Sequence, residues 1–403
     1  MQRRLPVLFI LITVVIDSMG IGLIFPVMPD LIREVTGRDL AHAALWGGVL
    51  STGFAVMQFL FGPLLGNLSD RYGRRPVLLV SLAVMAADYL VMALAGSIWL
   101  LFAGRIVGGI TAATHSTASA YMADISRPEE KAANFGLIGA AFGLGFILGP
   151  VLGGLLAGYG TRAPFYAAGA LAAINMVFGW TVLRETVSDA IRRPFELRRA
   201  HPFGAFRSMT SLPGMGRLLV FLFLYEFAVM VYPATWAYFT QERFDWAPGM
   251  VGLSLTVYGL ASILVQAVLI RPVLRWLGEA RTILAGLAFN VVAFVVLASL
   301  TNGLVALVFT PVSALGSVVT PALQALLSHR AASNQQGELQ GAVSSIRSMA
   351  MILSPLVMTG VFATFTGPAA PVYLPGAAFL LCATLMVVCG LVFVARTRAP
   401  AGA

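Results

Sequence analysis

Charge is scarce in this chain. Only 11% of its 403 residues are Asp, Glu, Lys or Arg, whereas 59% are hydrophobic and the mean hydropathy is +0.87. The core of a soluble protein of this length does not need so much apolar surface. The composition therefore excludes a soluble globular protein and indicates a chain that crosses a membrane many times.

Two kinds of catalytic motif are absent. The chain contains no GxxxxGK[ST] phosphate-binding loop and no HExxH metal pair, so it gives no support to ATP hydrolysis or zinc chemistry. It also shows no nucleophile-triad spacing and no soluble catalytic or signalling domain. We therefore expect no cofactor, no metal and no enzymatic activity, which disfavours a membrane-embedded enzyme or a sensor.

Cysteine is rare as well. The two cysteines, Cys382 and Cys389, lie seven residues apart in one apolar stretch. On a helix this separation is roughly 10 Å, which is beyond the reach of a disulfide. We expect both to be small packing residues.

Long apolar stretches are abundant. Twelve of them are each close to the roughly 20 residues that a membrane-spanning helix needs. The first contains Asp17 near its middle and no small-residue cleavage site, so we expect a retained helix and not a signal peptide. The predicted spans are residues 5–29, 45–66, 76–95, 99–122, 133–159, 164–183, 216–239, 249–270, 281–299, 303–327, 339–364 and 375–394.

Basic residues are distributed unequally between the two sides of these spans. If both termini are cytoplasmic, twenty of the 26 Lys and Arg residues lie in inner segments, four in outer segments and two within spans. Positive charge accumulates on the cytoplasmic side of membrane proteins. Topology therefore explains the net charge of +9 better than binding to nucleic acid does, and we expect both termini to be cytoplasmic.

One long break separates six spans from the next six. Residues 184–215 are rich in arginine and are interpreted as a cytoplasmic linker between the domains 1–183 and 216–403, with contact to anionic lipid as the alternative. A shift of 205 residues brings the second half onto the first without a gap. The coincident pairs are Gly47 and Gly252, Gly73 and Gly278, Gly136 and Gly341, and Pro150 and Pro355.

This repeat predicts the fold class. Parallel repeats indicate two six-helix bundles related by a pseudo-two-fold axis along the membrane normal, with a binding site at their interface near the bilayer midplane. The same shift places Arg275 opposite Asp70 and Thr310 opposite Arg105, so most of the charged positions belong to the first half. We expect an all-α membrane protein of twelve transmembrane helices.

Charges inside the spans are the best candidates for function, because an ionised side chain at mid-bilayer costs roughly 2.5–3.5 kcal/mol. They are Asp17, Asp88, Arg105, Glu226 and Arg347. Asp17 and Glu226 lie near the midplane, where a carboxylate can hold a proton and a cationic substrate in turn. We expect Arg105 to be the partner of Asp17.

The other polar candidates have two interpretations each. Glu226 is a proton site or a substrate contact, with a satisfied buried acid as the alternative, and Asp88 is functional or peripheral. Arg347 contacts Glu226 or the substrate, or it extends toward the inner face. His115 either titrates or is hydrogen-bonded packing among Thr114, Ser116 and Thr117.

Aromatic side chains suggest a surface for a flat, partly apolar guest. Tyr232 and Trp236 lie four residues apart on one predicted helical face, with Tyr225, Phe142 and Phe146 as possible neighbours. Aromatic stripes facing lipid are the alternative.

Several motifs together resemble the Major Facilitator Superfamily, most closely its twelve-helix drug:proton antiporters and among these the tetracycline efflux proteins. They are Asp17 to Pro26 with Pro29, Gly66 to Pro76, Gly104 with Arg105, Tyr121 to Asp124, and Gly139 to Gly154. The resemblance covers nearly the whole chain. It implies a monomer in the bacterial inner membrane, a proton-coupling role for Arg105, and an acid on the third helix at Asp88.

Two motifs have a physical interpretation beside the one that the resemblance implies. The tight turn from Gly66 to Pro76 anchors the inner interface through its arginines, and the resemblance makes it a conformational latch. Its residues are Gly66, Asp70, Arg71, Gly73, Arg74 and Arg75. The second motif allows close helix packing with a bend at its proline, and resembles an antiporter signature. Its residues are Gly139, Gly143, Gly145, Gly149, Pro150, Gly153 and Gly154.

The chain departs from the tetracycline pattern at two positions. Ser262 stands where that family carries a histidine, and Asn290, a candidate substrate contact, stands where it carries an acid. Whether tetracycline itself is a substrate therefore stays open, and Glu226 is a candidate to replace the lost acid. We expect proton-coupled efflux of a small amphipathic drug-like compound by alternating access, with a metabolite facilitator or proton symporter as the alternative.

Overall fold

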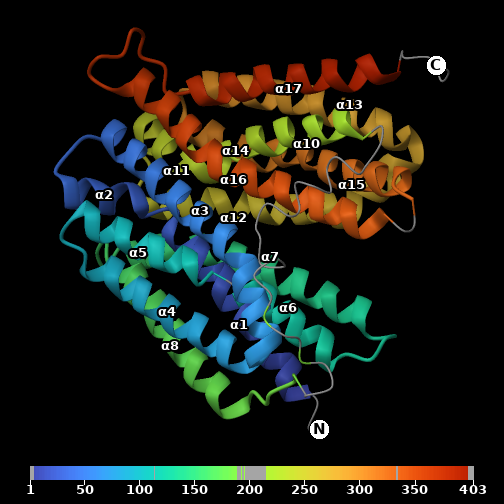
Figure 1. Cartoon of the computed structure of the whole chain (residues 1–403). Helices are drawn as coiled ribbons and strands as arrows, with labels where there is room; N and C mark the ends of the chain where they lie inside the picture. The colour runs from blue at the N-terminus through green and yellow to red at the C-terminus, as the bar shows by residue number, and fades with distance from the viewer. Residues whose placement is uncertain are drawn as a thin grey trace. The chain divides into compact units, whose positions relative to one another are not determined.

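The computed structural model describes residues 4–112, 114–187, 192, 195, 215–332 and 335–397. Most of the predicted linker 184–215 lies outside these residues. The described part of the chain is helical, with no strand, which confirms the predicted fold class (Figure 1).

Among the described residues, eight helices precede the linker and the other elements follow it. The first group comprises α1 (Arg4–Ile24), α2 (Met28–Thr36), α3 (Leu40–Tyr72), α4 (Arg74–Leu94), α5 (Ile98–Ile110), α6 (Thr114–Ile125), α7 (Lys131–Ala157) and α8 (Ala163–Val182). The second comprises α10 (Gly216–Val229), α11 (Val231–Phe244), α12 (Pro248–Leu264), α13 (Ile270–Ser299), α14 (Gly303–Ser313), α15 (Val319–Arg330), α16 (Gln336–Thr366) and α17 (Ala377–Thr397). A π-helical turn, η1 (Val265–Leu269), joins α12 to α13, and a 3₁₀ turn, η2 (Ala314–Val318), joins α14 to α15.

The helices account for the predicted spans. Eleven helical stretches of the described residues are long and apolar enough to cross a membrane, and one of them, Pro248–Ser299, has 52 residues. This stretch contains two predicted spans, because the backbone turns at Gly278, where φ is 71° and ψ is 171°. The first span is shorter than predicted: α1 ends at Ile24, and Pro29 belongs to the separate helix α2. Pro26 and Pro29 supply no backbone N–H to continue α1.

The turn predicted from Gly66 to Pro76 is wrong in its extent. Helix α3 continues to Tyr72 and α4 begins at Arg74, so Gly73 alone separates them, with φ 110° and ψ 156°. Gly66 is helical, and a side chain at this position would meet open space, so it serves neither turning nor packing. The charged residues after Gly66 favour water over lipid, but charged residues do not end a helix, so α3 continues until Gly73.

The repeat is visible in the helix neighbours within two compact units. Unit 1 contains residues 1–38, 53–202 and 247–256, and unit 2 contains residues 39–52, 203–246 and 257–403. In unit 1, α1 packs against α7 and α4 against α8; in unit 2, α10 packs against α16 and α13 against α17 (Figure 1). The shift of 205 residues also relates the two positive-φ breaks at Gly73 and Gly278.

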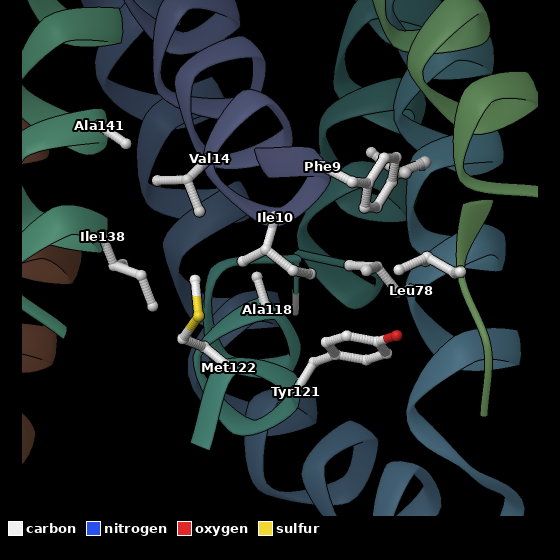
Figure 2. Packing of buried hydrophobic residues seen from close by; sticks show 11 residues of the cluster. Phe9, Ile10, Val14, Leu78, Ala118, Tyr121, Met122, Ile138 and Ala141 are labelled. Carbon is white, nitrogen blue, oxygen red and sulfur yellow. The ribbon is translucent and has the colours of Figure 1, made fainter. Parts of the chain in front are cut away.

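The core of unit 1 is formed by side chains from four helices. Figure 2 shows Phe9, Ile10 and Val14 of α1 in one buried cluster with side chains of α4, α6 and α7. The labelled partners are Leu78, Ala118, Tyr121, Met122, Ile138 and Ala141.

In unit 2, Cys382 and Cys389 of α17 are buried and form no disulfide, as expected for packing residues.

Glycines of α7 bring its backbone against α1. A Cβ at Gly145, Gly149 or Gly153 would overlap backbone atoms of α1 between Val15 and Leu23. This confirms the close packing predicted from the glycine spacing. Other residues of the motif differ: Gly154 packs against Pro248 and Gly249, Gly139 faces open space, Gly143 is half-buried, and α7 continues through Pro150.

A side chain at Gly149 tests this contact. We expect Gly149→Val to lower the stability of the detergent-solubilised protein by about 1–3 kcal/mol, because overpacking forces the two backbones apart. The measurement is the thermal midpoint followed by gel filtration. Gly139→Val is the matched control on the same helix and should leave the midpoint unchanged; equal losses in both variants would contradict the assigned packing.

Candidate functional site

Asp88 and Arg105 form a buried ion pair in unit 1. Asp88, on α4, is 5% exposed, and its Oδ2 accepts a hydrogen bond from Nη2 of Arg105 on α5. A Cβ at Gly104 or Gly108 would overlap the Asp88 carboxylate, so these two glycines leave the space that the acid occupies. The Arg105 guanidinium also lies over the ring of Phe54, 4.8 Å from its centroid.

This pairing corrects the prediction that Arg105 is the partner of Asp17. Asp88 lies six residues before the end of α4, and Arg105 lies seven residues after the start of α5. Helices α4 and α5 pack together across a short connection, so the two side chains come to the same depth. The short connection was the sequence signal that could have identified the pair.

Asp17 differs from the other acids within the spans. It is half-buried on α1, and no described residue forms an ion pair or a hydrogen bond with it. Ser18, its neighbour, bonds to the backbone of its own helix through Val14. Asp17 is therefore a carboxylate in an apolar helix without a basic side chain to neutralise it in the described part of the chain.

Glu226 and Arg347 form a second ion pair, in unit 2. Arg347 Nε on α16 donates to Glu226 Oε1 on α10 at 2.9 Å, which resolves the open alternatives for Arg347 in favour of Glu226. The side chain of Glu226 is 14% exposed and that of Arg347 is 38% exposed. A hydrogen bond of 2.7 Å from Ser354 Oγ to the Phe227 carbonyl also joins the two helices.

Three predicted substrate contacts are buried within unit 2. Trp236 is 2% exposed, and its ring centroid lies 6.0 Å from that of Tyr232 and 6.1 Å from that of Phe379. Asn290 is also buried, and its Nδ2 donates to the Gly316 carbonyl at 3.3 Å. These ring contacts and this hydrogen bond all join residues of unit 2.

Phe142 and Phe146 have a more open environment in unit 1. Their rings stack with centroids 6.2 Å apart. The ring centroid of Phe25, which directly follows α1, lies 6.1 Å from that of Phe146, and the exposed His115 of α6 meets Phe142 edge-on at 5.6 Å. We call these four residues the aromatic strip. Phe25 was not predicted, and His115 makes a ring contact in place of the expected hydrogen bonds.

Ionic contacts surround Gly73, where α3 meets α4. Arg74 pairs with Asp70 at 2.5 Å and with Asp124 of α6 at 3.2 Å. Arg75 Nη2 donates to the Trp180 carbonyl at 2.9 Å, while the Arg71 guanidinium lies over Tyr72. The predicted latch residues Asp70 and Arg74 thus join α3 and α4 to α6.

Glu185 completes this cluster and was not predicted. Its carboxylate accepts hydrogen bonds from the backbone N–H groups of Arg74 at 2.9 Å and Arg75 at 3.2 Å, which are unsatisfied donors at the start of α4. A Cβ at Gly73 would overlap this carboxylate, so glycine is needed here for space as well as for its positive φ.

The second half has a related pair in which the acidic and the basic residue exchange positions. His329 Nδ1 and Glu279 Oε1 lie 2.7 Å apart in unit 2. The shift of 205 residues places Glu279 on Arg74 and His329 on Asp124. The repeat has therefore conserved the location of the contact without conserving the residue types.

These features define the class of protein. Apolar membrane-length helices in two repeated units, with ion pairs between helices and away from their ends, are the architecture of a multi-pass transporter for small molecules and not of an enzyme. The described residues hold no group of three or more His, Cys, Asp or Glu side chains that could bind a metal. The model of the Major Facilitator Superfamily matches residues 10–355 and 218–403, and the chain belongs to this family.

Related proteins match this sequence over nearly its whole length. The chain is 41% identical to the tetracycline resistance protein of class C from Escherichia coli, over 90% of this chain and 91% of that protein. It is 40% identical to the class G protein from Vibrio anguillarum, over 89% and 90%. The crystal structure of the nucleoside transporter NupG has the same fold, with a TM-score of 0.81 at 14% identity over 98% of this chain and all of that one.

Removing Arg105 tests the ion pair with Asp88. We expect Arg105→Ala to destabilise the protein by about 3–5 kcal/mol, because the Asp88 carboxylate is left buried without its partner. Adding Asp88→Asn to Arg105→Ala should restore part of the loss, measured as the thermal midpoint in detergent. Arg347→Ala should cost less, since its pair is more exposed. No recovery in the double variant would contradict this account.

Proposed function

We propose that this drug efflux transporter exports a small amphipathic compound, tetracycline-like or broader, in exchange for protons. The observation that carries the proposal is the contrast among the three acids within its spans. Asp88 and Glu226 each have an arginine partner, whereas Asp17 has none among the described residues. Asp17 is therefore the acid that can change its charge without breaking an ion pair.

Competition for Asp17 would couple the two fluxes. An ionised carboxylate in an apolar setting attracts either a proton or the cationic group of a substrate, and it cannot hold both. A substrate that leaves on one side is then replaced by a proton, and the proton must leave before substrate binds again. This exclusion is the physical basis for antiport, and alternation of two repeated units would carry it across the membrane.

The aromatic strip supports an aromatic or otherwise flat substrate. Phe25 and the stacked Phe142 and Phe146 offer partly exposed ring faces, and Phe25 directly follows the helix that carries Asp17. Such rings bind a flat apolar body. The names of the tetracycline resistance proteins agree with a polycyclic drug as one substrate.

The cluster at Gly73 supports a latch at the cytoplasmic ends of the helices. Arg74 binds acids of α3 and α6, and Glu185, near the start of the predicted linker, binds the start of α4. We propose that both termini are cytoplasmic, as the distribution of basic residues indicates, and that the transporter acts as a monomer.

Everted membrane vesicles test the exchange directly. Adding tetracycline, or another compound from a panel of antibiotics, dyes and cations, to energised vesicles should release protons from their lumen. We expect Asp17→Asn to reduce this release to the level of vesicles without the protein, because an amide cannot carry the proton.

Asp30→Asn is the control, since Asp30 pairs with Arg33 on the short helix α2 outside the spans. It should release protons as the unmodified protein does. Full proton release by Asp17→Asn with any transported compound would refute the proposed role of Asp17. Substrate uptake into cells that acidifies the cytosol would favour a symporter.

A further inference from the structure

Tyr89 places a buried phenol beside the helix that carries Asp17. It follows Asp88 on α4 and is 4% exposed. Its hydroxyl lies against Gly20 of α1, where a Cβ would overlap both the hydroxyl and the ring. Gly20 is one turn from Asp17, and residues three apart share a helical face. The missing side chain at Gly20 therefore admits the phenol on the side of α1 where Asp17 lies.

Charged groups approach Tyr89 from three helices. The phenol is within electrostatic range of Asp17 on α1, Asp88 on α4 and Arg105 on α5. Helix α8 also packs near Tyr89, at Gly169, but its sequence contains no Asp, Glu, Lys, Arg or His. Asp17 and the ion pair therefore supply the charges that this phenol faces.

Hydrogen-bonding capacity is left unused around Tyr89. Among the described residues, neither the Tyr89 hydroxyl nor the Asp17 carboxylate has a hydrogen-bond partner. Asp88 Oδ1 and Arg105 Nε are likewise buried without a partner in that part of the chain. Tyrosine hydroxyls in apolar surroundings normally find a partner, and one bridging water can connect polar groups that are too far apart for a direct bond.

We propose that Tyr89 is a positioning residue for Asp17. Its hydroxyl donates, through one water molecule, to the ionised Asp17 carboxylate, and it connects that charge to the Asp88–Arg105 pair. Donation stabilises the ionised acid more than the neutral acid, so the hydroxyl sets the pH at which Asp17 releases its proton. This inference rests on the proposed function, in which Asp17 is the group that exchanges a proton.

Infrared titration measures this property without a substrate. The carboxylic acid band of Asp17 is identified as the band that disappears in Asp17→Asn. In Tyr89→Phe the lost donor should make the ionised form less favourable, so the protonated band persists to higher pH. We expect its midpoint to rise by about one pH unit, the effect of one hydrogen bond.

Two further variants separate this role from packing. Gly20→Ala should raise the midpoint in the same direction, because the methyl group displaces the phenol. Tyr166→Phe removes a hydroxyl from a half-exposed tyrosine on α8 of the same unit and should leave the midpoint unchanged.

The outcomes distinguish this inference from the proposed function. A titrating Asp17 band with the same midpoint in Tyr89→Phe and in the unmodified protein would overturn the role of Tyr89 and leave proton exchange at Asp17 intact. A spectrum without any titrating Asp17 band would overturn both.

Discussion

The cost of placing charge in hydrocarbon governs the arrangement of this protein. Among the residues that the structure describes, the acids and arginines away from the ends of the predicted spans are Asp17, Asp88, Arg105, Glu226 and Arg347. The last four form two ion pairs. Pairing offsets the loss of hydration only when the partners meet at the same depth with good geometry. Helix packing must therefore bring specific residues together, and the remaining acid, Asp17, differs because no arginine of the described residues pairs with it.

Glycine provides the space in which these charges are accommodated. Gly104 and Gly108 make room for the Asp88 carboxylate, and Gly20 makes room for the Tyr89 phenol. At Gly73 the missing side chain admits Glu185 to the start of α4. In each case a glycine without a Cβ leaves the space that a polar side chain from another segment occupies. The glycines and the polar side chains therefore depend on one another.

The sequence was sufficient for the large features and insufficient for the pairings. Apolar length located the spans, and the repeat of Gly73 at Gly278 anticipated equivalent breaks in the two halves. The set of in-span charges was also evident. Which arginine meets which acid depends on helix neighbours and on depth, so Arg105 was assigned to Asp17 although it binds Asp88. Glu185 was not predicted because the free N–H groups at the start of a helix can bind a carboxylate from any part of the chain, so sequence distance gives no signal.

The close contact between α1 and α7 has a consequence for selectivity. Gly145, Gly149 and Gly153 seat the backbone of α1 directly on α7, without intervening side chains that could repack. This contact holds Asp17, on α1, and Phe25, just after it, beside the helix that carries Phe142 and Phe146. In the proposed function, the distance between the acid and the rings is therefore set by main-chain packing, and this distance would limit which substrates fit.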